Sequence, residues 1–338
     1  MNTLLLNSSK ESILTAAKFL KSGGLCAIPT ETVYGLAANA LDSGAVAKIF
    51  AAKGRPQDNP LIVHIASLSM LEELVLYIPD SARRLTQRFW PGPLTIILPK
   101  SGKIPNEVSA GLDTVAVRMP AHSLALELIT AAGVPLAAPS ANLSGSPSPT
   151  CAAHVMADLN GRIDAVLDGG SCTVGVESTV ITLASEKPRL LRPGAVTPEQ
   201  LRELLGEVEI DPAVLSQLQA GEAASSPGMK YKHYAPKARI TIIEGDLQSF
   251  NEYLQAYSKH SKAFALCFEG EEGAIPLPCV SYGRQECPDE QAARLFDALR
   301  RLDELGAERV FARCPAKEGL ALAVYNRLLR AAGFDVRN

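Results

Sequence analysis

Short apolar strands alternate with amphipathic helices along most of this chain. Compact runs rich in β-branched residues, such as residues 61–65 and 94–98, are separated by stretches with apolar residues at helical spacing, such as residues 81–89. Alternating strands and helices are typical of a layered α/β domain in which helices cover a sheet. This pattern does not give the strand order, so a parallel sheet and a mixed sheet both fit it.

The alternation is interrupted once, by a segment of different character. Residues 220–226 are small and polar, which is typical of a linker, whereas residues 227–237 collect tyrosines, lysines and a histidine between prolines. A second strand–helix–strand pattern follows, and 338 residues are enough for two cores. We expect an α/β domain over residues 1–205, a linker over residues 206–238 and a second α/β domain over residues 239–338.

The composition narrows the class of protein. The net charge of −3 provides no global positive field that would recruit nucleic acid. No run approaches the roughly 20 apolar residues of a membrane span, and the first residues lack the features of a secretory signal, so we expect a cytoplasmic protein. Seven cysteines without a C-x-x-C pair argue against a zinc site and a disulfide framework.

Two polar loops are candidate binding segments for a phosphorylated ligand. The common phosphate-loop and dinucleotide fingerprints are absent, so nucleotide chemistry would need another arrangement. Lys53 and Arg55 flank a glycine and precede Asn59, and such a pair of cations can hold a polyphosphate. The loop over residues 139–149 follows a buried strand and carries Ser140, Asn142 and Ser148. Polar loops at strand ends are where α/β sheets place ligand sites.

Further polar residues lie at or near the ends of predicted strands. The segment PTETVYGL, which includes Thr30, Glu31 and Thr32, follows the first predicted strand, and Arg118 closes the strand TVAVR. Other strand residues of this kind are His64, Ser178 and Arg192. No nucleophile–base pair stands out among them. Catalysis by positioning and charge stabilisation is therefore favoured over covalent catalysis.

Seven blocks in order resemble one known enzyme family. They are PTETVYGLAANA, KGRP-x-x-NPL-x-VH, WPGPLT, VAVRMP, APSAN-x-SG-x-PSPT, GVESTV and LRPGA. Together they resemble the threonylcarbamoyl-AMP synthase family over roughly residues 10–200. The segment SPGMKYKHYAPK followed by a small α/β domain resembles the two-domain form of that family. The resemblance implies a YrdC-like domain with a twisted, mixed sheet and flanking helices, and a small Rossmann-like C-terminal domain.

The resemblance also implies a reaction. L-threonine, bicarbonate and ATP would give threonylcarbamoyl-AMP and pyrophosphate, assisted by Mg²⁺ that is bound mainly through the ATP phosphates. The product would pass to proteins that transfer the threonylcarbamoyl group to a tRNA adenosine next to the anticodon. Weak binding of tRNA by this chain is left open, as is the role of the C-terminal domain.

Site residues carry over from the resemblance by position. Lys53 and Arg55 would serve catalysis. The predicted threonine pocket consists of Thr32, His64, Arg118, Ala138 and Ser178. The predicted ATP site consists of Lys53, Arg55, Asn59, Thr114, Ser140, Asn142, Ser148, Arg192, Tyr231, His233 and Tyr234, the last three in a linker that would close over the site as a lid.

Two other functions remain open from the residues alone. An RNA-binding accessory factor would use a patch formed by Lys53, Arg55, Arg83, Arg84, Arg88, Arg118 and Arg192, and its binding would fall steeply with salt. A carbamoyl- or acyl-transferring maturation enzyme would turn over with carbamoyl phosphate in place of bicarbonate.

Overall fold

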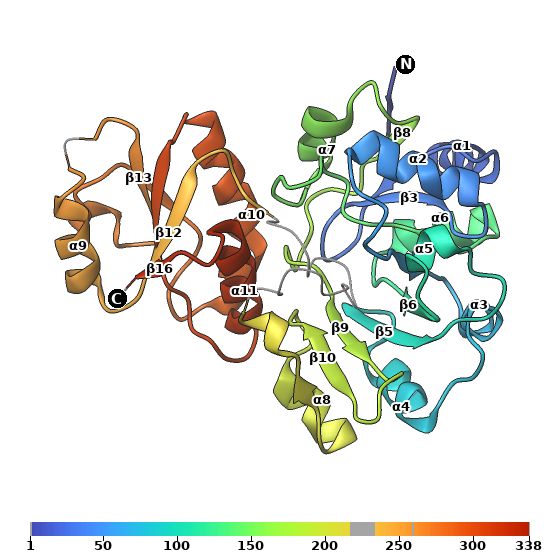
Figure 1. The fold of residues 1–338 in the computed structure, drawn as a ribbon. Helices are drawn as coiled ribbons and strands as arrows, with labels where there is room; N and C mark the ends of the chain where they lie inside the picture. Colours follow the sequence, from blue (N-terminus) through green and yellow to red (C-terminus); the bar gives the residue numbers. More distant parts are fainter. Residues whose placement is uncertain (1, 217–233, 259, 338) are drawn as a thin grey trace. The chain divides into compact units, whose positions relative to one another are not determined.

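The computed structural model describes residues 2–216, 234–258 and 260–337 (Figure 1). The described chain forms two compact units. One contains residues 2–144 and 148–214, and the other contains residues 145–147, 215–216 and 234–337. Of the predicted linker, residues 206–216 and 234–238 are described, and the rest lies outside the described residues.

The first unit is built on a mixed sheet of eleven strands. In spatial order these are β1 (Leu4–Leu6), β8 (Ala165–Leu167), β2 (Cys26–Ile28), β3 (Gly35–Asn39), β7 (Leu136–Ala137), β4 (Ile62–His64), β6 (Thr114–Arg118), β5 (Leu94–Pro99), β9 (Thr179–Thr182), β10 (Arg189–Arg192) and β11 (Glu209–Ile210). β4 is parallel to β6, whereas β5 is antiparallel to β6, which makes the sheet mixed as predicted.

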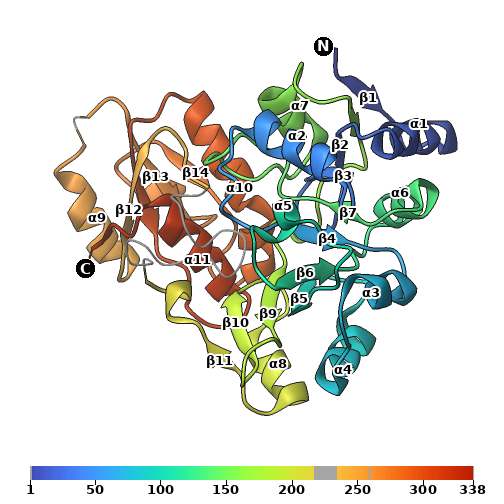
Figure 2. The ribbon, with the colours of Figure 1, turned by 45° about the vertical axis from the view of Figure 1, so that its right-hand side comes forward.

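The helices of this unit flank the sheet (Figure 2). They are α1 (Lys10–Lys21), α2 (Ser43–Lys53), α3 (Leu68–Leu74), α4 (Asp80–Phe89), α5 (Asn106–Ser109), α6 (Ser123–Ala132), α7 (Ala152–Leu159), α8 (Pro198–Leu205) and the 3₁₀ turn η1 (Pro212–Val214).

Local capping sets the ends of the helix that leads into the first candidate loop. Asp42 accepts hydrogen bonds from the backbone N–H groups of Gly44 and Ala45, at 2.9 and 3.1 Å, and so begins α2. Gly54 ends α2 with φ 62°, a conformation that favours glycine, and this turns the chain directly after Lys53. α1 is capped in a similar way, because Oγ of Ser9 accepts from the N–H of Ser12 at 3.2 Å.

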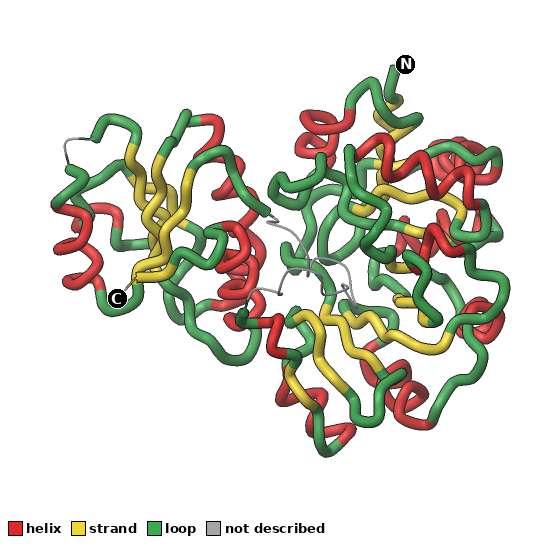
Figure 3. Tube along the Cα trace, viewed as in Figure 1, coloured by secondary structure: helices red, strands yellow, loops and turns green. Residues whose placement is uncertain are grey.

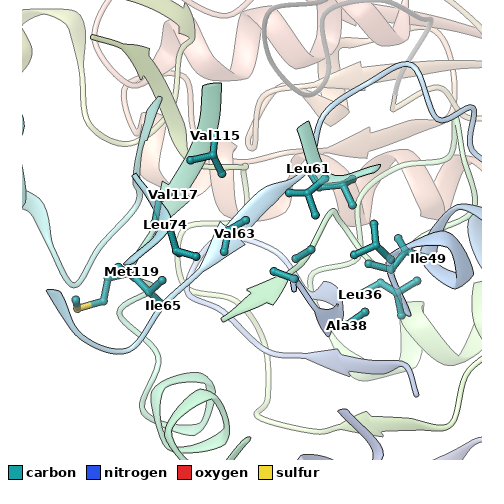
Figure 4. Packing of buried hydrophobic residues seen from close by; sticks show 14 of the residues in the cluster. Leu36, Ala38, Ile49, Leu61, Val63, Ile65, Leu74, Val115, Val117 and Met119 are labelled. Carbon is teal, nitrogen blue, oxygen red and sulfur yellow. The ribbon is translucent and has the colours of Figure 1, made fainter. Parts of the chain in front are cut away.

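Alternation along β4 and β6 separates core from site. Figure 4 shows Val63 together with Val115 and Val117 in the buried cluster between the sheet and its helices. Successive side chains of a strand point to opposite faces, so His64 and Arg118 lie on the other face of the sheet. The two are register partners at the ends of these parallel strands.

The second unit is a parallel five-stranded sheet with order β14-β13-β15-β12-β16. Its strands are β12 (Arg239–Ile243), β13 (Ala263–Cys267), β14 (Cys279–Ser281), β15 (Arg309–Arg313) and β16 (Val336–Arg337). Its helices are α9 (Leu247–Gln255), η2 (Glu272–Ala274), α10 (Pro288–Glu304) and α11 (Ala321–Ala331). Within this unit, α9 covers one face of the sheet while α10 and α11 cover the other (Figures 1 and 3).

Candidate active site

Arg118 is held at the end of β6 by three separate partners. Its Nε donates to the carbonyl oxygen of Gly92 at 3.1 Å, and its Nη1 donates to Oγ1 of Thr32 at 2.8 Å. Its Nη2 forms an ion pair with Oε1 of Glu31 at 2.7 Å. A guanidinium carries five N–H donors, so two remain for a ligand after these contacts. The arrangement presents a fixed fork suited to a carboxylate.

The loop that supplies Thr32 and Glu31 is buried and internally bonded. Oγ1 of Thr30 lies 2.8 Å from Oγ1 of Thr32 and donates to the carbonyl of Val33 at 2.7 Å. Apart from its ion pair with Nη2 of Arg118, the carboxylate of Glu31 has no hydrogen-bond donor among the described residues. This carboxylate therefore keeps lone pairs that can accept from an additional group.

His64 is buried next to Arg118 and is neutral. Burial, with a smaller contribution from the positive charge of Arg118, lowers the pKa of His64 to about 3. Its Nδ1 has no hydrogen-bond partner within the part of the chain that the structure describes. A neutral imidazole with an unused nitrogen can donate to or accept from a bound ligand.

The state of His64 leads to a prediction for acid stability. Between pH 6.5 and about 3, an unfolded chain carries a proton on His64 that the folded chain does not bind. Folding stability should therefore fall as the pH is lowered from 6.5, by about 1.4 kcal/mol per pH unit from this group. Urea unfolding at pH 7, 6 and 5 measures the slope.

The matched variant for this prediction is His64→Asn, which should flatten the slope by that amount. Equal slopes in the wild type and His64→Asn would contradict a depressed pKa at His64.

Ser178 and Arg192 form a second bonded group beside Thr95. The hydroxyl oxygens of Ser178 and Thr95 lie 2.8 Å apart. Arg192 donates from Nη2 to Oγ of Ser178 at 3.1 Å and from Nε to its carbonyl at 3.0 Å. β9, which begins at Thr179, is parallel to β5, and β5 pairs with β6, so β5 lies between this group and Arg118 in one sheet.

Gly194 maintains the close approach of β10 to β9. A Cβ at this position would lie 2.3 Å from the backbone nitrogen of Thr179, a contact that real side chains do not make. We expect Gly194→Ala to lower the free energy of unfolding by about 2–3 kcal/mol, which chemical denaturation measures, and to displace the neighbouring Ser178. Gly102→Ala is the control, since nothing lies within 4 Å of its Cβ, and its stability should stay within about 0.5 kcal/mol of the wild type. Equal losses in both variants would argue against a packing constraint at Gly194.

Lys53 connects α2 to the loop over residues 139–149. Its Nζ donates to the carbonyls of Ser140 and Asn142 at 2.5 and 2.6 Å, with Oδ1 of Asn142 at 3.4 Å. Burial and the adjacent charge of Arg55 lower the pKa of Lys53 well below its usual value. The acceptors of Nζ thus lie in one loop, and Lys53 anchors that loop to α2.

The other described residues of the predicted ATP site are placed as follows. Arg55 donates from Nη2 to the carbonyl of Asn59 at 3.2 Å, and the buried Oδ1 of Asn59 has no hydrogen-bond partner among the described residues. Thr114 is the first residue of β6. Ser140 forms an isolated antiparallel β-bridge with Gly35.

Backbone bonds attach the loop over residues 139–149 to the PTETVYGL segment. The N–H of Tyr34 donates to the carbonyl of Pro149 at 2.9 Å, and the N–H of Leu36 donates to that of Pro139 at 2.7 Å. The N–H of Ala138 donates to the carbonyl of Ile62, two residues before His64. These contacts bring the predicted threonine and nucleotide residues of the first unit around one group of strands.

Three predicted residues do not belong to this group of contacts. Tyr231 and His233 lie outside the described residues, so their assignment stays a prediction. Tyr234 belongs to the second unit, where its ring packs 5.2 Å from that of Phe296 and Arg327 lies over it at 5.9 Å. Its role toward ATP likewise stays a prediction.

Two buried carboxylates received no role from the sequence. Glu31 pairs with Arg118, and Oε1 of Glu177 accepts from Oγ of Ser148 at 2.5 Å. The sequence signal that could have pointed to them is their position inside the motifs PTETVYGL and GVESTV. A glutamate that is buried in such a motif is expected to be paired, because unpaired buried glutamates are rare. Within residues 2–216, 234–258 and 260–337, no group of three or more His, Cys, Asp or Glu side chains is arranged to hold a metal ion.

The fold and these contacts define a two-domain α/β protein whose first unit holds a group of buried and bonded cationic side chains, among them Arg118, Arg192 and Lys53. Among the described residues, no helix combines the length and the apolar character that crossing a bilayer requires. A family model described as telomere recombination matches residues 18–194, and one described as threonylcarbamoyl-AMP synthase, C-terminal domain, matches residues 196–333.

Curated relatives match nearly the whole chain. The threonylcarbamoyl-AMP synthase of Pyrococcus abyssi is 47% identical over 328 residues, which covers 96% of this chain and 95% of that protein. The Bacillus subtilis protein of the same name is 47% identical over 331 residues, with 97% and 95% covered. A crystal structure of P. abyssi Sua5 complexed with L-threonine matches with a TM-score of 0.94 and 45% identity, covering 99% of this chain and all of the other.

The chain therefore belongs to the threonylcarbamoyl-AMP synthase family of enzymes, in its two-domain form. The family resemblance and the fold class predicted from the sequence are both confirmed.

Proposed function

We propose that this enzyme makes L-threonylcarbamoyl-AMP from L-threonine, bicarbonate and ATP and releases pyrophosphate. The observation that carries the proposal is the Arg118 fork, buried and fixed by Gly92, Thr32 and Glu31. The P. abyssi relative described as complexed with L-threonine supports threonine as the substrate that this fork binds.

Recognition of threonine would combine charge and hydroxyl groups. The two remaining donors of Arg118 would hold the substrate carboxylate as a bidentate pair. Thr32 and Ser178 would contact the side-chain hydroxyl, with His64 and the Ala138 backbone completing the pocket. A site that bonds a substrate hydroxyl rejects analogues lacking it far more strongly than analogues lacking a methyl group.

The chemistry would proceed by positioning and charge stabilisation. The threonine nitrogen, after loss of a proton, attacks the carbon of bicarbonate, and a carbamate and water form. A carbamate oxygen then attacks the α-phosphorus of ATP, and pyrophosphate leaves. The nucleotide would lie along Thr114 and the loop that bears Ser140, Asn142 and Ser148, and Arg55, Arg192 and Lys53 would offset the charge on the leaving pyrophosphate.

Mg²⁺ would be bound mainly by the phosphates of ATP rather than by a set of protein side chains. Mg²⁺ often keeps several of its waters and binds through substrate phosphates, so it would need no dedicated set of protein ligands. The carboxylate of Glu177 and the hydroxyl of Ser148 are hard oxygen donors in the site and could add to its coordination. When bound, Mg²⁺ would neutralise charge that develops on the phosphates.

The setting we propose is the cytoplasm, where the product passes to proteins that transfer the threonylcarbamoyl group to a tRNA adenosine next to the anticodon. The linker with Tyr231, His233 and Tyr234 would close over the site and exclude water, which protects the labile carbamate.

The RNA-binding alternative is weakened by burial. Arg118, Arg192 and Lys53 are at least nine-tenths buried and are bonded to groups of their own unit. A phosphate backbone follows exposed cations, so these three residues are poorly placed for a continuous basic patch.

Release of pyrophosphate tests the proposal directly. Purified protein with ATP and Mg²⁺ should release pyrophosphate only when threonine and bicarbonate are both present. Turnover with carbamoyl phosphate in place of bicarbonate would support the carbamoyl-transfer alternative. Release without threonine would exclude the proposed reaction, and so would no release under any condition.

A further inference from the structure

A polar pocket of about 420 Å³ lies on one face of the C-terminal sheet. Its floor is formed by Thr241 of β12 and Phe311 of β15, which are register partners. Arg239 and Arg309, two residues earlier on the same strands, are also register partners. Alternation of side chains therefore places all four on the face that α9 covers, where Phe311 belongs to the same buried cluster as residues of α9.

The pocket exists because this face has a single helix. α9 packs on one side of the sheet, whereas α10 and α11 share the other side (Figure 1). Near the C-terminal end of α9, the rings of Tyr253 and Tyr257 stack with centroids 5.9 Å apart. The ring of Tyr257 also lies 4.4 Å from that of Phe311. These rings form an aromatic wall beside the amino-terminal ends of β12 and β15.

Arginine dominates the charge of the pocket. Its lining contains Arg239, Arg309 and Arg337 but only one carboxylate, Asp335, for a net charge of +2. Asp335 pairs with Arg239 at 2.9 Å and with Arg337 at 3.0 Å. Arg309 forms no ion pair among the described residues and lies over the ring of Tyr257 at 5.8 Å.

Stability alone does not account for this arrangement. The side chains of Arg239 and Arg337 are 71% and 56% exposed. Exposed ion pairs contribute little to folding, and the three like charges repel one another. Such a cluster is better suited to an anion that enters the pocket, since a guanidinium forms forked bonds with phosphate oxygens.

We propose that this pocket binds a nucleotide, with its base against the Tyr253–Tyr257 wall and its phosphate on Arg309 and the neighbouring arginines. Aromatic rings stack on bases of any sequence, and a pocket of this size is in the range that small ligands occupy. A free nucleotide and one nucleotide of a single-stranded RNA offer the same chemistry. All residues that line the pocket belong to the C-terminal unit, and none of them is a residue of the proposed synthase site.

Calorimetric titration of the full-length protein with ATP tests the proposal for a free nucleotide. The wild type should show two binding sites. Arg309→Glu should weaken one of them by about tenfold or more, because a reversed charge repels phosphate, and Tyr257→Leu should weaken the same one by about tenfold. Arg55→Ala should weaken binding only at the proposed ATP site of the first unit. A failure of the synthase proposal can therefore be distinguished from a failure of this proposal.

Whether the bound nucleotide belongs to an RNA is tested by fluorescence anisotropy with a labelled single-stranded RNA of about ten nucleotides. Binding of the RNA that Arg309→Glu weakens about tenfold, without a second ATP site, would assign the pocket to RNA. The control is Arg301→Glu, another exposed arginine of this unit, which pairs with Glu304 and does not line the pocket. It should leave both ligands unaffected, and unfolding curves confirm that each variant is folded.

The proposal is overturned if the wild type binds ATP at one site only and its RNA binding, if any, is the same in Arg309→Glu. It is also overturned if Arg301→Glu and Arg309→Glu weaken binding equally, since general charge rather than the pocket would then be responsible.

Discussion

Replacing Arg118 by lysine is expected to lower kcat/KM for threonine by about a thousandfold while leaving the protein folded. Lysine keeps the positive charge beside Glu31 but cannot present two parallel N–H donors to a carboxylate. Two hydrogen bonds to charged groups contribute about 1.5–3 kcal/mol each, and 1.36 kcal/mol corresponds to a factor of ten in rate. Pyrophosphate release at varied threonine concentration measures the loss, and an unchanged KM for threonine in this variant would remove Arg118 from the pocket.

Arg118→Met tests the contribution that the ion pair between Arg118 and Glu31 makes to folding stability. It leaves the carboxylate of Glu31 buried without a counter-charge, so we expect a loss of about 3–5 kcal/mol in the free energy of unfolding. The double variant Glu31→Gln/Arg118→Met should recover most of this loss but none of the activity, because the carboxylate is neutralised while the fork is still absent.

The control for stability is Arg189→Met, which removes an ion pair to Glu209 whose side chains are 43% and 39% exposed. It should cost less than about 1 kcal/mol. A double variant no more stable than Arg118→Met would mean that the loss arises from packing rather than from the unpaired carboxylate.

The sequence predicted those parts of the site that interrupt a strong pattern. A charged residue at the end of an apolar strand is conspicuous, and Arg118 lies at such a position at the end of β6, whereas His64 was assigned to the site by the resemblance alone.

Contacts between distant segments could not be predicted in this way. Arg118 and Thr32 are 86 positions apart, and Ser148 and Glu177 are 29 apart. The hydrophobic periodicity of a segment does not indicate which strands become neighbours, because strand order depends on how the whole sheet packs. Glu31 and Glu177 consequently stood in motifs without a role until the fold placed each beside its partner.

Very short strands were the other limit of the sequence pattern. β8 has three residues, too few for alternation to stand out, yet it lies inside the sheet. In the second unit, β14 and β16 were missed for the same reason. The pocket that we assign to a nucleotide includes Arg337 of β16, so it could not be predicted before the fold was known.

Lys53→Met is expected to lower kcat/KM for ATP by about a hundredfold and to cost about 2–3 kcal/mol of stability. Nζ of Lys53 satisfies the carbonyls of Ser140 and Asn142, and without it the loop that would hold the nucleotide loses its anchor to α2. A buried carbonyl left without a donor costs about 1–3 kcal/mol. Pyrophosphate release at varied ATP concentration and chemical denaturation measure the two effects.

Lys48→Met is the matched control, because it removes a lysine of the same helix whose Nζ donates to the carbonyl of Gly23 at 2.6 Å. This contact lies away from the 139–149 loop, so Lys48→Met should cost some stability but leave ATP kinetics unchanged. Lys53→Arg distinguishes charge from shape, since a guanidinium keeps the charge but cannot direct a single nitrogen at both carbonyls. If Lys53→Arg restores full ATP use, Lys53 acts through its charge on phosphate, and its role in shaping the loop is secondary. If it remains as defective as Lys53→Met, the position of the loop is what the reaction requires.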